Sequence, residues 1–572
     1  MVTPPPKAPI PSGGRIRLIV ACTLVFLLLL GGRSAYLQVV QGPSLRENAL
    51  RQQVSGKVIL LPRRGTIFDR NGNILAQTTD SYRVDIRPSD IPAEKRAEVA
   101  RALATCLSIP PQDLLQKLET LVSPFPLDRQ ISVNTGEEIQ ALAFPGVDVY
   151  PSAKRVYPLG SQASHVLGFV HPELSSINVE EYIGGEGLEF ACEDLLHGKA
   201  GQATYLVGPT GERLPLDPVE FIPPQDGNSL VLTLDSTIQS VTEEELKIGV
   251  ETNSATTGCA IVLDSRTGEV LALASYPAYN PLDAGTRTPS HLFNVATQFL
   301  YEPGSVFKFV TGAAALEEGV TTLDTEWTDD GTIYVDDWPV LCPAEFGAPH
   351  GVQKLAELFQ NSCNVGFAKI GLKLGAAKFR QYANAFGFGR LNALELPQAA
   401  GRLDPADLWP EIGLATASFG YSMMLVTPLQ IAAAFQIVAN DGHYVPLHLI
   451  KEIRDPSGKT LQTLSPQATR QVISQKTAIQ LRQALRGVVE SKLSDTLRRY
   501  GVAGKTGTAN SDTEYNNTTF VGAFPADNPR VVILVNINQP QVDLGYAVRV
   551  CYPVFEKIVS KLVDILRVEP PQ

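Results

Sequence analysis

The apolar residues near the N-terminus predict a membrane-spanning helix. Leu18 to Gly32 forms an uncharged run, and apolar residues continue to Val40. Crossing a bilayer takes about 20 apolar residues, so this stretch is long enough. A cleaved signal peptide is the alternative, but no clear A-x-A cleavage site follows the run. We therefore expect an uncleaved signal anchor over residues 18–40 and a single-pass protein, because no second run of this length follows.

Basic residues lie on one side of this predicted span. Lys7, Arg15 and Arg17 precede it, and basic residues favour the cytoplasmic side of a membrane. We therefore expect a cytoplasmic tail over residues 1–17 and a protein of the plasma (inner) membrane. The remaining chain would lie in the periplasm or its extracytoplasmic equivalent.

The next part of the chain predicts a β-rich domain. The expected elements are two short strands within Arg64 to Ala76 around Asn71-Gly72, helices over residues 93–118 interrupted by Pro110-Pro111, and strand structure over residues 147–170. Asn-Gly between two strands favours a type I′ hairpin turn. Residues 207–228 are rich in proline and glycine and form the best domain boundary. We expect a non-catalytic domain over residues 41–225.

After that boundary, strands flank a helical middle. The expected strands are 230–234, 258–264, 269–275, 502–508, 519–524 and 531–537. The expected helices are 237–248, 305–318, 353–374, 377–386, 427–440, 475–489 and 553–568. Strands at both ends with helices between them predict one antiparallel sheet packed by helices and assembled from distant parts of the sequence. We assign this α+β domain to residues 226–572.

Composition excludes several functions. The chain has 572 residues and a formal charge of −11, which argues against a nucleic-acid partner, since such proteins need a basic face. Its seven cysteines form no C-x-x-C pair, and its seven histidines form no H-E-x-x-H. Neither a zinc ribbon nor the commonest zinc-protease site is therefore indicated. We expect no metal and no cofactor.

The first motif with chemical potential is the only S-x-x-K of the chain, at Ser305 and Lys308. Pro303 and Gly304 stop the preceding structure, and an apolar helix follows. The serine would lie at a helix N-terminus, where unpaired N–H groups favour an anion, with the lysine one turn along on the same face. A lysine can activate a serine only if desolvation or neighbouring cations lower its pKa. The alternative is a capping serine beside a surface lysine.

The second motif is the only K-T-G, within Gly504 to Thr508. Gly507 has no side chain, so the backbone of a ligand can approach the strand closely. Three polar side chains of this segment together suit a carboxylate: Lys505, Thr506 and Thr508. A phosphate-binding loop would need glycine at position 499, which is Arg499.

The third motif, S-x-N, occurs at Ser132, Ser176 and Ser362. Only Ser362, with Asn364, lies between the other two motifs. S-x-x-K, S-x-N and K-T-G in this order are the set found in penicillin-binding proteins and class A β-lactamases.

On these motifs the chain resembles a class B penicillin-binding protein, a monofunctional peptidoglycan D,D-transpeptidase, along nearly its whole length. Further segments are similar to the family's pedestal motifs and to a helix between its catalytic motifs: Arg64 to Gly72, Arg155 to Pro158 with Ala163 to Gly168, Gly185 to Glu189 with Gly198 to Gly201, and Thr427 to Gln430 with Ala439 to Gly442. The resemblance implies an N-terminal transmembrane helix, an elongated β-rich pedestal and a penicillin-binding, β-lactamase-like transpeptidase domain.

The resemblance implies a role for each motif residue. Ser305 would attack the penultimate D-Ala of a donor stem peptide, and Lys308 would take its proton. Ser362 would pass a proton to the leaving D-Ala, and Asn364 would hold the donor amide. An amine of a neighbouring stem would then attack the acyl-serine and form a cross-link.

The K-T-G segment would bind the donor. Lys505 would provide positive charge, while Thr506 and Thr508 would bind the terminal carboxylate next to Gly507. Backbone N–H groups of Ser305 and Thr508 would form the oxyanion hole. β-Lactams would acylate the same serine.

Several alternatives stay open. The chain is most similar to the division (septal) branch, with an elongation-type transpeptidase as the alternative. A D-Ala-D-Ala carboxypeptidase or a β-lactamase would use water as acceptor, and a non-catalytic β-lactam-binding scaffold would not turn over. Expected partners are a membrane glycosyltransferase and other division machinery, contacting the transmembrane and pedestal segments.

Two departures from the family affect the site. Cys363 occupies the middle of S-x-N: in the cleft its thiol could be oxidised or alkylated, and otherwise it is a small packed residue. Ser418 to Ser422 reads Ser-Phe-Gly-Tyr-Ser, where relatives often have a Gly-Gln-Gly turn.

Overall fold

The computed structural model describes residues 13–42, 55–174, 180–206, 218–342, 349–466, 470–509, 515–542 and 545–569. Three predicted features lie wholly or partly outside these residues: the start of the tail, the S-x-N copy at Ser176, and residues 207–217 of the proline- and glycine-rich boundary. The chain divides into two compact units, residues 1–62 with 199–225, and residues 63–198 with 226–572. The predicted domain boundaries stay predictions.

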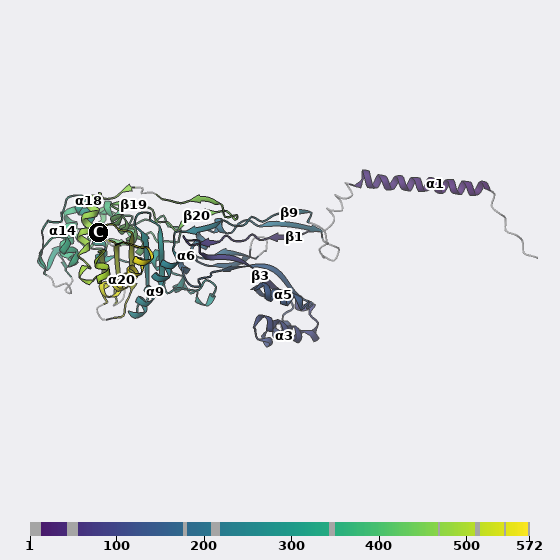
Figure 1. The fold of residues 1–572 in the computed structure, drawn as a ribbon, viewed down its shortest axis with the longest axis horizontal. Helices are drawn as coiled ribbons and strands as arrows, with labels where there is room; N and C mark the ends of the chain where they lie inside the picture. The colour runs from purple at the N-terminus through teal and green to yellow at the C-terminus, as the bar shows by residue number, and fades with distance from the viewer. Residues whose placement is uncertain are drawn as a thin grey trace, which may run out of the picture. The chain divides into compact units, whose positions relative to one another are not determined.

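The smaller unit contains the apolar N-terminal helix (Figure 1). Helix α1 (Gly13–Ala35) continues into a π-helical turn, η1 (Tyr36–Val40). Among the described residues, Ile16–Val40 is the one helical stretch long and apolar enough to cross a membrane, as expected of a single-pass membrane protein. This unit also holds an antiparallel sheet in the order β1 (Ser55–Leu60), β8 (Gly201–Leu206) and β9 (Glu220–Ile222).

The first sheet of the larger unit is built around one long strand, β3 (Ile74–Ile86). It pairs antiparallel with β5 (Val147–Val156) and β4 (Phe125–Ile131). The sheet continues through β2 (Ile67–Phe68), β10 (Ser229–Leu232), β20 (Ile450–Arg454) and β21 (Thr460–Thr463). Three helices pack on it around a core that includes Val84 and Leu103: α3 (Arg96–Leu107), α4 (Pro111–Thr120) and α5 (Val133–Ala141). The predicted break at Pro110-Pro111 is confirmed, because Pro111 starts α4 at a position that needs no N–H.

The turn between β2 and β3 differs from the prediction. A type I′ turn needs positive φ at both central residues, but of Asn71 and Gly72 only Gly72 has positive φ, at +87°. The Asp69 carboxylate accepts hydrogen bonds from the backbone N–H groups of Asn71 and Asn73 at 2.8 and 2.9 Å. This side-chain cap stabilises a longer turn. Strand structure over residues 147–170 is also shorter than predicted, since β5 ends at Val156 and a helix, α6 (Ser164–Leu167), follows.

A buried ion network joins the segments that resemble the three pedestal motifs. Glu189, on α7 (Gly187–Ala191), accepts hydrogen bonds from Arg64 Nε at 2.5 Å and Arg155 Nε at 2.8 Å. Burial alone would raise the pKa of Glu189, but the two guanidinium groups hold it below its usual range. Removing one partner of a buried ion pair costs about 3–5 kcal/mol, so this network holds the three segments together.

The second sheet has five antiparallel strands in the order β12 (Val270–Tyr276), β11 (Thr257–Asp264), β25 (Val531–Asn538), β24 (Asn517–Phe524) and β23 (Ala503–Ala509). The prediction of an antiparallel sheet from distant parts of the sequence is confirmed for five of its six strands. The strand predicted over residues 230–234 is β10 of the first sheet and pairs parallel with β2. Side chains alternate between two cores: Ile261 enters one and Val262 the other. Strand β23 lies at the sheet edge, so one side of its backbone is free to contact other elements.

Helices cover both faces of this sheet. On one face, α9 (Ser236–Thr252) and α20 (Ala547–Ile565) pack together (Figure 1). On the other, α12 (Lys308–Glu317), α17 (Pro428–Ala439) and α18 (Gln475–Arg486) share the larger core. The predicted helix over residues 377–386 is also present, as α15 (Ala376–Ala385).

Two predicted helices need correction. Residues 353–374 form two helices, α13 (Leu355–Gln360) and α14 (Asn364–Leu374), separated at residues 361–363. The C-terminal helix α20 begins before residue 553 and contains Pro553. Proline removes one helical hydrogen bond, at a cost of about 3 kcal/mol. The apolar face of α20 offsets this cost, because it buries residues on both sides of the proline, including Val550 and Phe555.

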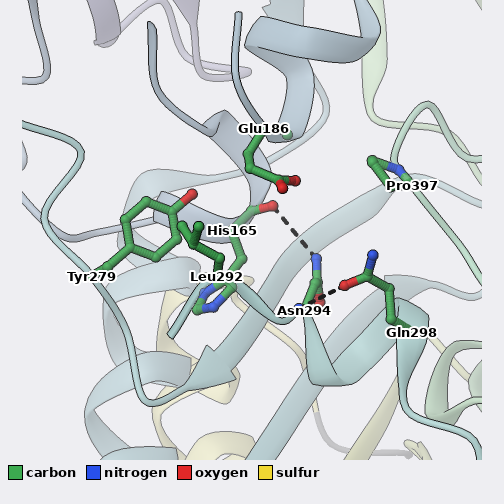
Figure 2. Close-up of a pocket in the computed structure, with 8 residues that line it drawn as sticks. His165, Glu186, Tyr279, Leu292, Asn294, Gln298 and Pro397 are labelled. Atoms are coloured by element: carbon green, nitrogen blue, oxygen red, sulfur yellow. Dashed lines mark hydrogen bonds between the residues drawn. The ribbon is translucent and has the colours of Figure 1, made fainter. Parts of the chain in front are cut away.

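Figure 2 shows His165 next to Tyr279, Leu292 and Asn294, which belong to the stretch of chain that follows β12. His165 Nε2 lies 2.8 Å from the carbonyl oxygen of His291, and Tyr279 donates its hydroxyl proton to Ser164 O at 2.8 Å. Asn294 Nδ2 donates to His165 O at 3.4 Å. Burial lowers the pKa of His165 to about 4, so its ring stays neutral. These contacts fix a second pedestal-like motif against residues 279–298.

The remaining helices and strands are short: β6 (Val170–Leu174), β7 (Glu180–Gly184), α8 (Glu193–Leu196), α10 (Pro289–Leu292), α11 (Val295–Gln298), β13 (Trp327–Asp329), β14 (Thr332–Val335), β15 (Trp338–Leu341), β16 (Gly351–Gln353), β17 (Arg402–Leu403), α16 (Glu411–Ala417), β18 (Met424–Leu425), β19 (His443–Tyr444), β22 (Arg470–Gln471) and α19 (Asp495–Arg498).

Candidate active site

The S-x-x-K motif lies where a short 3₁₀ turn, η5 (Gly304–Phe307), leads into α12. Ser305 is half-buried on this turn, and Lys308 is completely buried as the first residue of the helix. The Nζ atom of Lys308 lies 2.9 Å from Ser305 Oγ. The alternative of a capping serine beside a surface lysine is therefore wrong.

The S-x-N motif occupies the junction between α13 and α14. Ser362 N donates to Phe359 O at 3.2 Å, and Cys363 N donates to Leu358 O at 3.0 Å. This is the Schellman pattern, in which the residue after the helix cap takes a left-handed conformation that usually belongs to glycine. Ser362 has φ +48° at that position. A side chain at such a position costs about 1–2 kcal/mol of stability. Ser362 therefore strains the backbone where glycine would not.

Lys308 contacts both polar residues of the S-x-N motif. Its Nζ donates to Ser362 O at 2.6 Å and to Asn364 Oδ1 at 2.7 Å, and it lies 3.1 Å from Ser362 Oγ. Lys505, from β23, donates to the same Ser362 Oγ at 3.1 Å and to Thr506 O at 3.0 Å. The Ser362 hydroxyl therefore lies between two buried amines.

Both lysines are shifted towards the neutral form. Burial lowers the pKa of Lys308 to about 7. Burial, and secondly the charge of Lys308, lower the pKa of Lys505 well below its ordinary value. Among the ion pairs of the described residues, none brings a carboxylate to either lysine. Near neutral pH the two amines are therefore not both fully protonated.

The hydrogen-bond geometry indicates where the lone pair of a neutral Lys308 points. Ser362 O and Asn364 Oδ1 can only accept, so they take the two N–H groups of the amine. The lone pair is then left for the two hydroxyls in reach, that of Ser305 at 2.9 Å and that of Ser362 at 3.1 Å. A neutral Lys308 can accept the proton of Ser305 without any side chain moving.

The K-T-G strand passes close to the serine turn. A Cβ atom on Gly507 would lie 2.9 Å from Val306 N, which real Cβ contacts do not allow, so glycine is needed for the close approach. Thr506 and Thr508 are half-buried on the same strand. The Thr508 Oγ1 atom accepts a hydrogen bond from Ala547 N at 3.2 Å, which leaves its hydroxyl proton free to be donated.

The backbone of Thr508 faces the serine turn. Its carbonyl oxygen accepts a hydrogen bond from the Tyr421 hydroxyl at 3.1 Å, so it points to the free edge of the sheet. In a strand, the N–H of a residue points to the same side as its C=O. The Thr508 N–H group is therefore directed at the same edge, next to Gly304.

Two functional contacts come from Ser418 to Ser422, the segment that departs from the family pattern. The first is the Tyr421 hydroxyl described above. The second is Gly420, whose carbonyl accepts a hydrogen bond from Gly304 N at 3.0 Å. A Cβ atom on Gly420 would lie 2.1 Å from Gly304 O. The glycine is a signal in the sequence for close approach, but no motif indicated the tyrosine.

Cys363 is completely buried and caps α14, with its Sγ accepting from Gly366 N at 3.2 Å. The Cys342 thiol donates to Cys363 Sγ at 3.1 Å, which lowers the pKa of Cys363 to about 7 and raises that of Cys342. Cys363 is therefore the packed residue of the two possibilities.

The structure brings all eight predicted site residues into one region: Ser305, Lys308, Ser362, Asn364, Lys505, Thr506, Gly507 and Thr508. It provides a hydroxyl next to a buried amine whose pKa is about 7, a second buried amine, and backbone N–H groups at a strand edge. Acyl transfer through a serine ester requires these groups: an activated nucleophile and hydrogen-bond donors for the oxyanion.

Comparisons with known proteins agree with this geometry. Residues 258–560 match the family model of the penicillin binding protein transpeptidase domain, and residues 59–232 match that of the penicillin-binding protein dimerisation domain. Stage V sporulation protein D of Bacillus subtilis is 32% identical over 97% of this chain and 86% of its own. A probable peptidoglycan D,D-transpeptidase, PenA, of Neisseria gonorrhoeae is 31% identical over 99% of this chain and 95% of its own. The crystal structure of a peptidoglycan synthetase from Bifidobacterium adolescentis has a TM-score of 0.71 at 26% identity, covering 91% of this chain and 98% of its own.

The strained position of Ser362 leads to a prediction about stability. Ser254 occupies the same Schellman position after α9, also with φ +48°, and is exposed. Ser254→Gly should raise the free energy of unfolding by about 1 kcal/mol, because glycine removes the backbone cost. Ser362→Gly should show no such gain, because its hydroxyl contacts two buried amines and losing it costs about 1–3 kcal/mol. Denaturant unfolding of the full chain in detergent measures both. Equal gains would mean that the Ser362 hydroxyl contributes no bonding.

Proposed function

The chain belongs to the class B penicillin-binding proteins, and we propose that Ser305 is the residue through which it performs their reaction. The family match and the relatives make the protein a serine-type peptidoglycan D,D-transpeptidase. One observation carries the assignment of Ser305: its Oγ lies 2.9 Å from the Nζ of Lys308, a buried lysine whose pKa is about 7. Ser132 and Ser176, the first residues of the two other S-x-N motifs, have no role in the proposed reaction.

The acylation step uses groups already in contact. Ser305 Oγ attacks the carbonyl carbon of the penultimate D-Ala of a donor stem, and its proton moves to Lys308 Nζ. Negative charge develops on the carbonyl oxygen, which the N–H groups of Ser305 and Thr508 stabilise. Preorganised donors of this kind contribute about 3–4 kcal/mol each. The C–N bond then breaks, and the proton passes through the Ser362 hydroxyl to the nitrogen of the departing D-Ala.

The second step restores the serine. An amine of a neighbouring stem attacks the ester carbon, loses a proton to Lys308, and displaces Ser305 Oγ, which takes that proton back. The product is an amide cross-link, and no net proton is consumed by the two steps together. A β-lactam follows the first step only, because its leaving nitrogen stays attached to the acyl group.

The donor is held by groups around this centre. The negative charge of the bound terminal carboxylate favours the protonated form of Lys505, which then provides a positive charge beside it. The hydroxyls of Thr506 and Thr508 donate to the same carboxylate. Gly507 lets the donor backbone approach the strand. Asn364 keeps its Nδ2 on Leu341 O at 3.0 Å and its Oδ1 on Lys308, so it orients the amine while it contacts the donor amide.

Membrane orientation follows from charge. Basic residues precede the apolar helix, so the N-terminus lies in the cytoplasm and the transpeptidase region lies outside the plasma membrane. There it meets its stem-peptide substrates. The helix and the pedestal segments then contact the membrane glycosyltransferase that makes the glycan strands, together with other cell-wall machinery.

The chain acts in septal wall synthesis during cell division. This proposal rests on the resemblance of the chain to the division branch of the family; its relatives include the peptidoglycan D,D-transpeptidase FtsI of Escherichia coli, similar over 97% of this chain. An elongation-type role is the alternative. Replacing the native gene by Ser305→Ala should give long filaments that lack septa, as counted by microscopy. Rounded cells with normal septa would instead assign the protein to elongation.

Covalent labelling tests the acyl-serine. A fluorescent penicillin should label the full chain in detergent, and the band should persist through a chase and vanish in Ser305→Ala. Ser290→Ala, an exposed serine outside the site, is the control and should label like the wild type. A band that fades within minutes would indicate a hydrolase. Labelling that survives in Ser305→Ala would refute the assignment. With an impermeant conjugate on intact spheroplasts, the same labelling tests the orientation.

The pKa of Lys308 gives the acylation rate a defined pH dependence. Lys308 accepts a proton only when neutral, so the rate constant should reach a plateau above about pH 8 and fall about tenfold per pH unit below about pH 6. Lys308→Ala should lower it by a factor of about 100 or more, whereas the exposed Lys476→Ala should leave it unchanged. Stopped-flow acylation with a chromogenic β-lactam measures both. A flat profile between pH 5 and pH 9 would exclude Lys308 as the base.

A further inference from the structure

Four side chains that commonly bind metals converge next to the S-x-N segment. Asp329, Cys342, His350 and Cys363 each offer one ligand atom, and these atoms all lie within 4.8 Å of one another. The two Sγ atoms are 3.1 Å apart, and His350 Nδ1 is 2.6 Å from Asp329 Oδ2. Among the described contacts, none joins this cluster to Ser305, so the proposed reaction leaves these groups unused.

The cluster is buried and comes from four separate elements. The side chains of Asp329 and His350 are 0% and 6% exposed, and Cys342 and Cys363 are 7% and 0% exposed. Asp329 ends β13, Cys342 follows β15, His350 precedes β16, and Cys363 caps α14. Pairing of β13 with β16 places Asp329 opposite the residue that follows His350. Burying four polar side chains costs more free energy than burying apolar side chains of the same size, so packing alone does not favour this cluster.

We propose that Asp329, Cys342, His350 and Cys363 form a tetrahedral binding site for one Zn²⁺ ion. Two sulfurs, one imidazole and one carboxylate are donor types that zinc takes in proteins. Both thiols release their protons to solvent when the metal binds. Three anionic ligands and one neutral ligand then leave the site with a net charge of −1. Soft thiolate ligands exclude magnesium and calcium, which take oxygen.

The observed distances suit this ion. Zinc–sulfur bonds of about 2.3 Å place two tetrahedral sulfurs about 3.7 Å apart, and zinc–nitrogen and zinc–oxygen bonds place those two atoms about 3.3 Å apart. The corresponding distances here are 3.1 Å between the sulfurs and 2.6 Å between His350 Nδ1 and Asp329 Oδ2. Each of these pairs needs to open by about 0.6–0.7 Å, and the widest separations in the cluster, up to 4.8 Å, need to close to about 3.3–3.7 Å.

Surrounding donors already point at the ligands. Gly331 N donates to Asp329 Oδ1 at 2.8 Å, and Gly366 N donates to Cys363 Sγ at 3.2 Å from the first turn of α14. The Gln353 side chain also faces Cys363, and its Nε2 is one of the buried polar atoms without a hydrogen-bond partner among the described residues. Thiolate ligands are stabilised by N–H donors of this kind. A metal-bound Cys363 thiolate would give Gln353 its partner.

The site would position the S-x-N motif. Cys363 stands between Ser362 and Asn364, and Asn364 Nδ2 donates to Leu341 O, the residue before Cys342. A metal bound to both cysteines would hold the motif from two sides. The metal site itself is independent of the proposed function; only this effect on acylation rests on it.

Metal analysis of the full chain tests the site. The protein, purified in detergent with any histidine tag removed, is dialysed against buffered zinc and assayed by mass spectrometry of the metal. About one zinc per chain is expected for the wild type. The same is expected for Cys106→Ser, a cysteine outside the cluster. Cys342→Ser and His350→Ala should each lose most of it. Cobalt substitution of the wild type should give intense tetrahedral visible bands and a sulfur-to-metal charge-transfer band, a readout that does not depend on any variant folding.

Three results would overturn the proposal. The first is a wild-type chain that binds little or no zinc while its thiols are free. The second is a chain whose mass is lower by two hydrogen atoms until it is reduced, with peptide mapping that locates the disulfide between Cys342 and Cys363 in place of the metal ligands. Zinc that is retained in both Cys342→Ser and His350→Ala would place the metal elsewhere and count equally against it.

The positioning effect has a separate readout. Removing zinc with a chelator should slow penicillin acylation about tenfold, and adding zinc back should restore the rate. If zinc binds as proposed but the wild type is never acylated, the proposed function fails and the metal site stands. If acylation is normal and unaffected by the chelator while zinc leaves, the positioning effect is refuted.

Discussion

The burial of Lys308 without a carboxylate partner is the constraint on which the rest of the site depends. Removing an ammonium group from water costs several kcal/mol, and in the described part of the chain no carboxylate pairs with Lys308 to offset that cost. Hydrogen bonds to Ser362 O and Asn364 Oδ1 satisfy the amine in its neutral form, while burial lowers its pKa to about 7. A serine beside a surface lysine would be inert, whereas the same pair inside this core has a base at neutral pH.

The segments that contact Lys308 and Ser305 approach them through backbone conformations that most residues do not adopt. The S-x-N motif approaches Lys308 because α13 ends in a Schellman turn, with Ser362 where glycine is normal. The K-T-G strand approaches the serine turn because Gly507 has no Cβ. Gly420 allows its own segment to touch Gly304 for the same reason. Three segments far apart in the chain therefore meet at distances that only small residues, or one strained serine, permit. Glycine at position 362 would fit the turn better but would leave two buried amines without a shared hydroxyl.

The sequence predicted those parts of the fold that local patterns encode. Strands β11, β12 and β25 follow from runs of apolar residues. The order of three motifs selected eight candidate site residues, which the structure brings together. Contacts between distant segments could not be predicted from local patterns. Nothing local shows that Ser362 lies on Lys308, 54 residues away, or that the Tyr421 hydroxyl reaches Thr508. Local competition also misled: Asp69 captures the N–H groups that a tight turn at Asn71 would need, and tertiary packing carries α20 through Pro553.

The cysteine and histidine pattern illustrates the same limit with a sharper consequence. Zinc motifs are recognised by ligands two to five residues apart, but Asp329, Cys342, His350 and Cys363 are spread over 35 residues and join only through the pairing of β13 with β16 and the start of α14. Once they are joined, Cys363 belongs to two systems. Its backbone links Ser362 and Asn364, whose side chains contact Lys308. Its sulfur belongs to the buried cluster. Anything that binds this sulfur therefore acts on the geometry of Lys308 through the two neighbouring residues, Ser362 and Asn364.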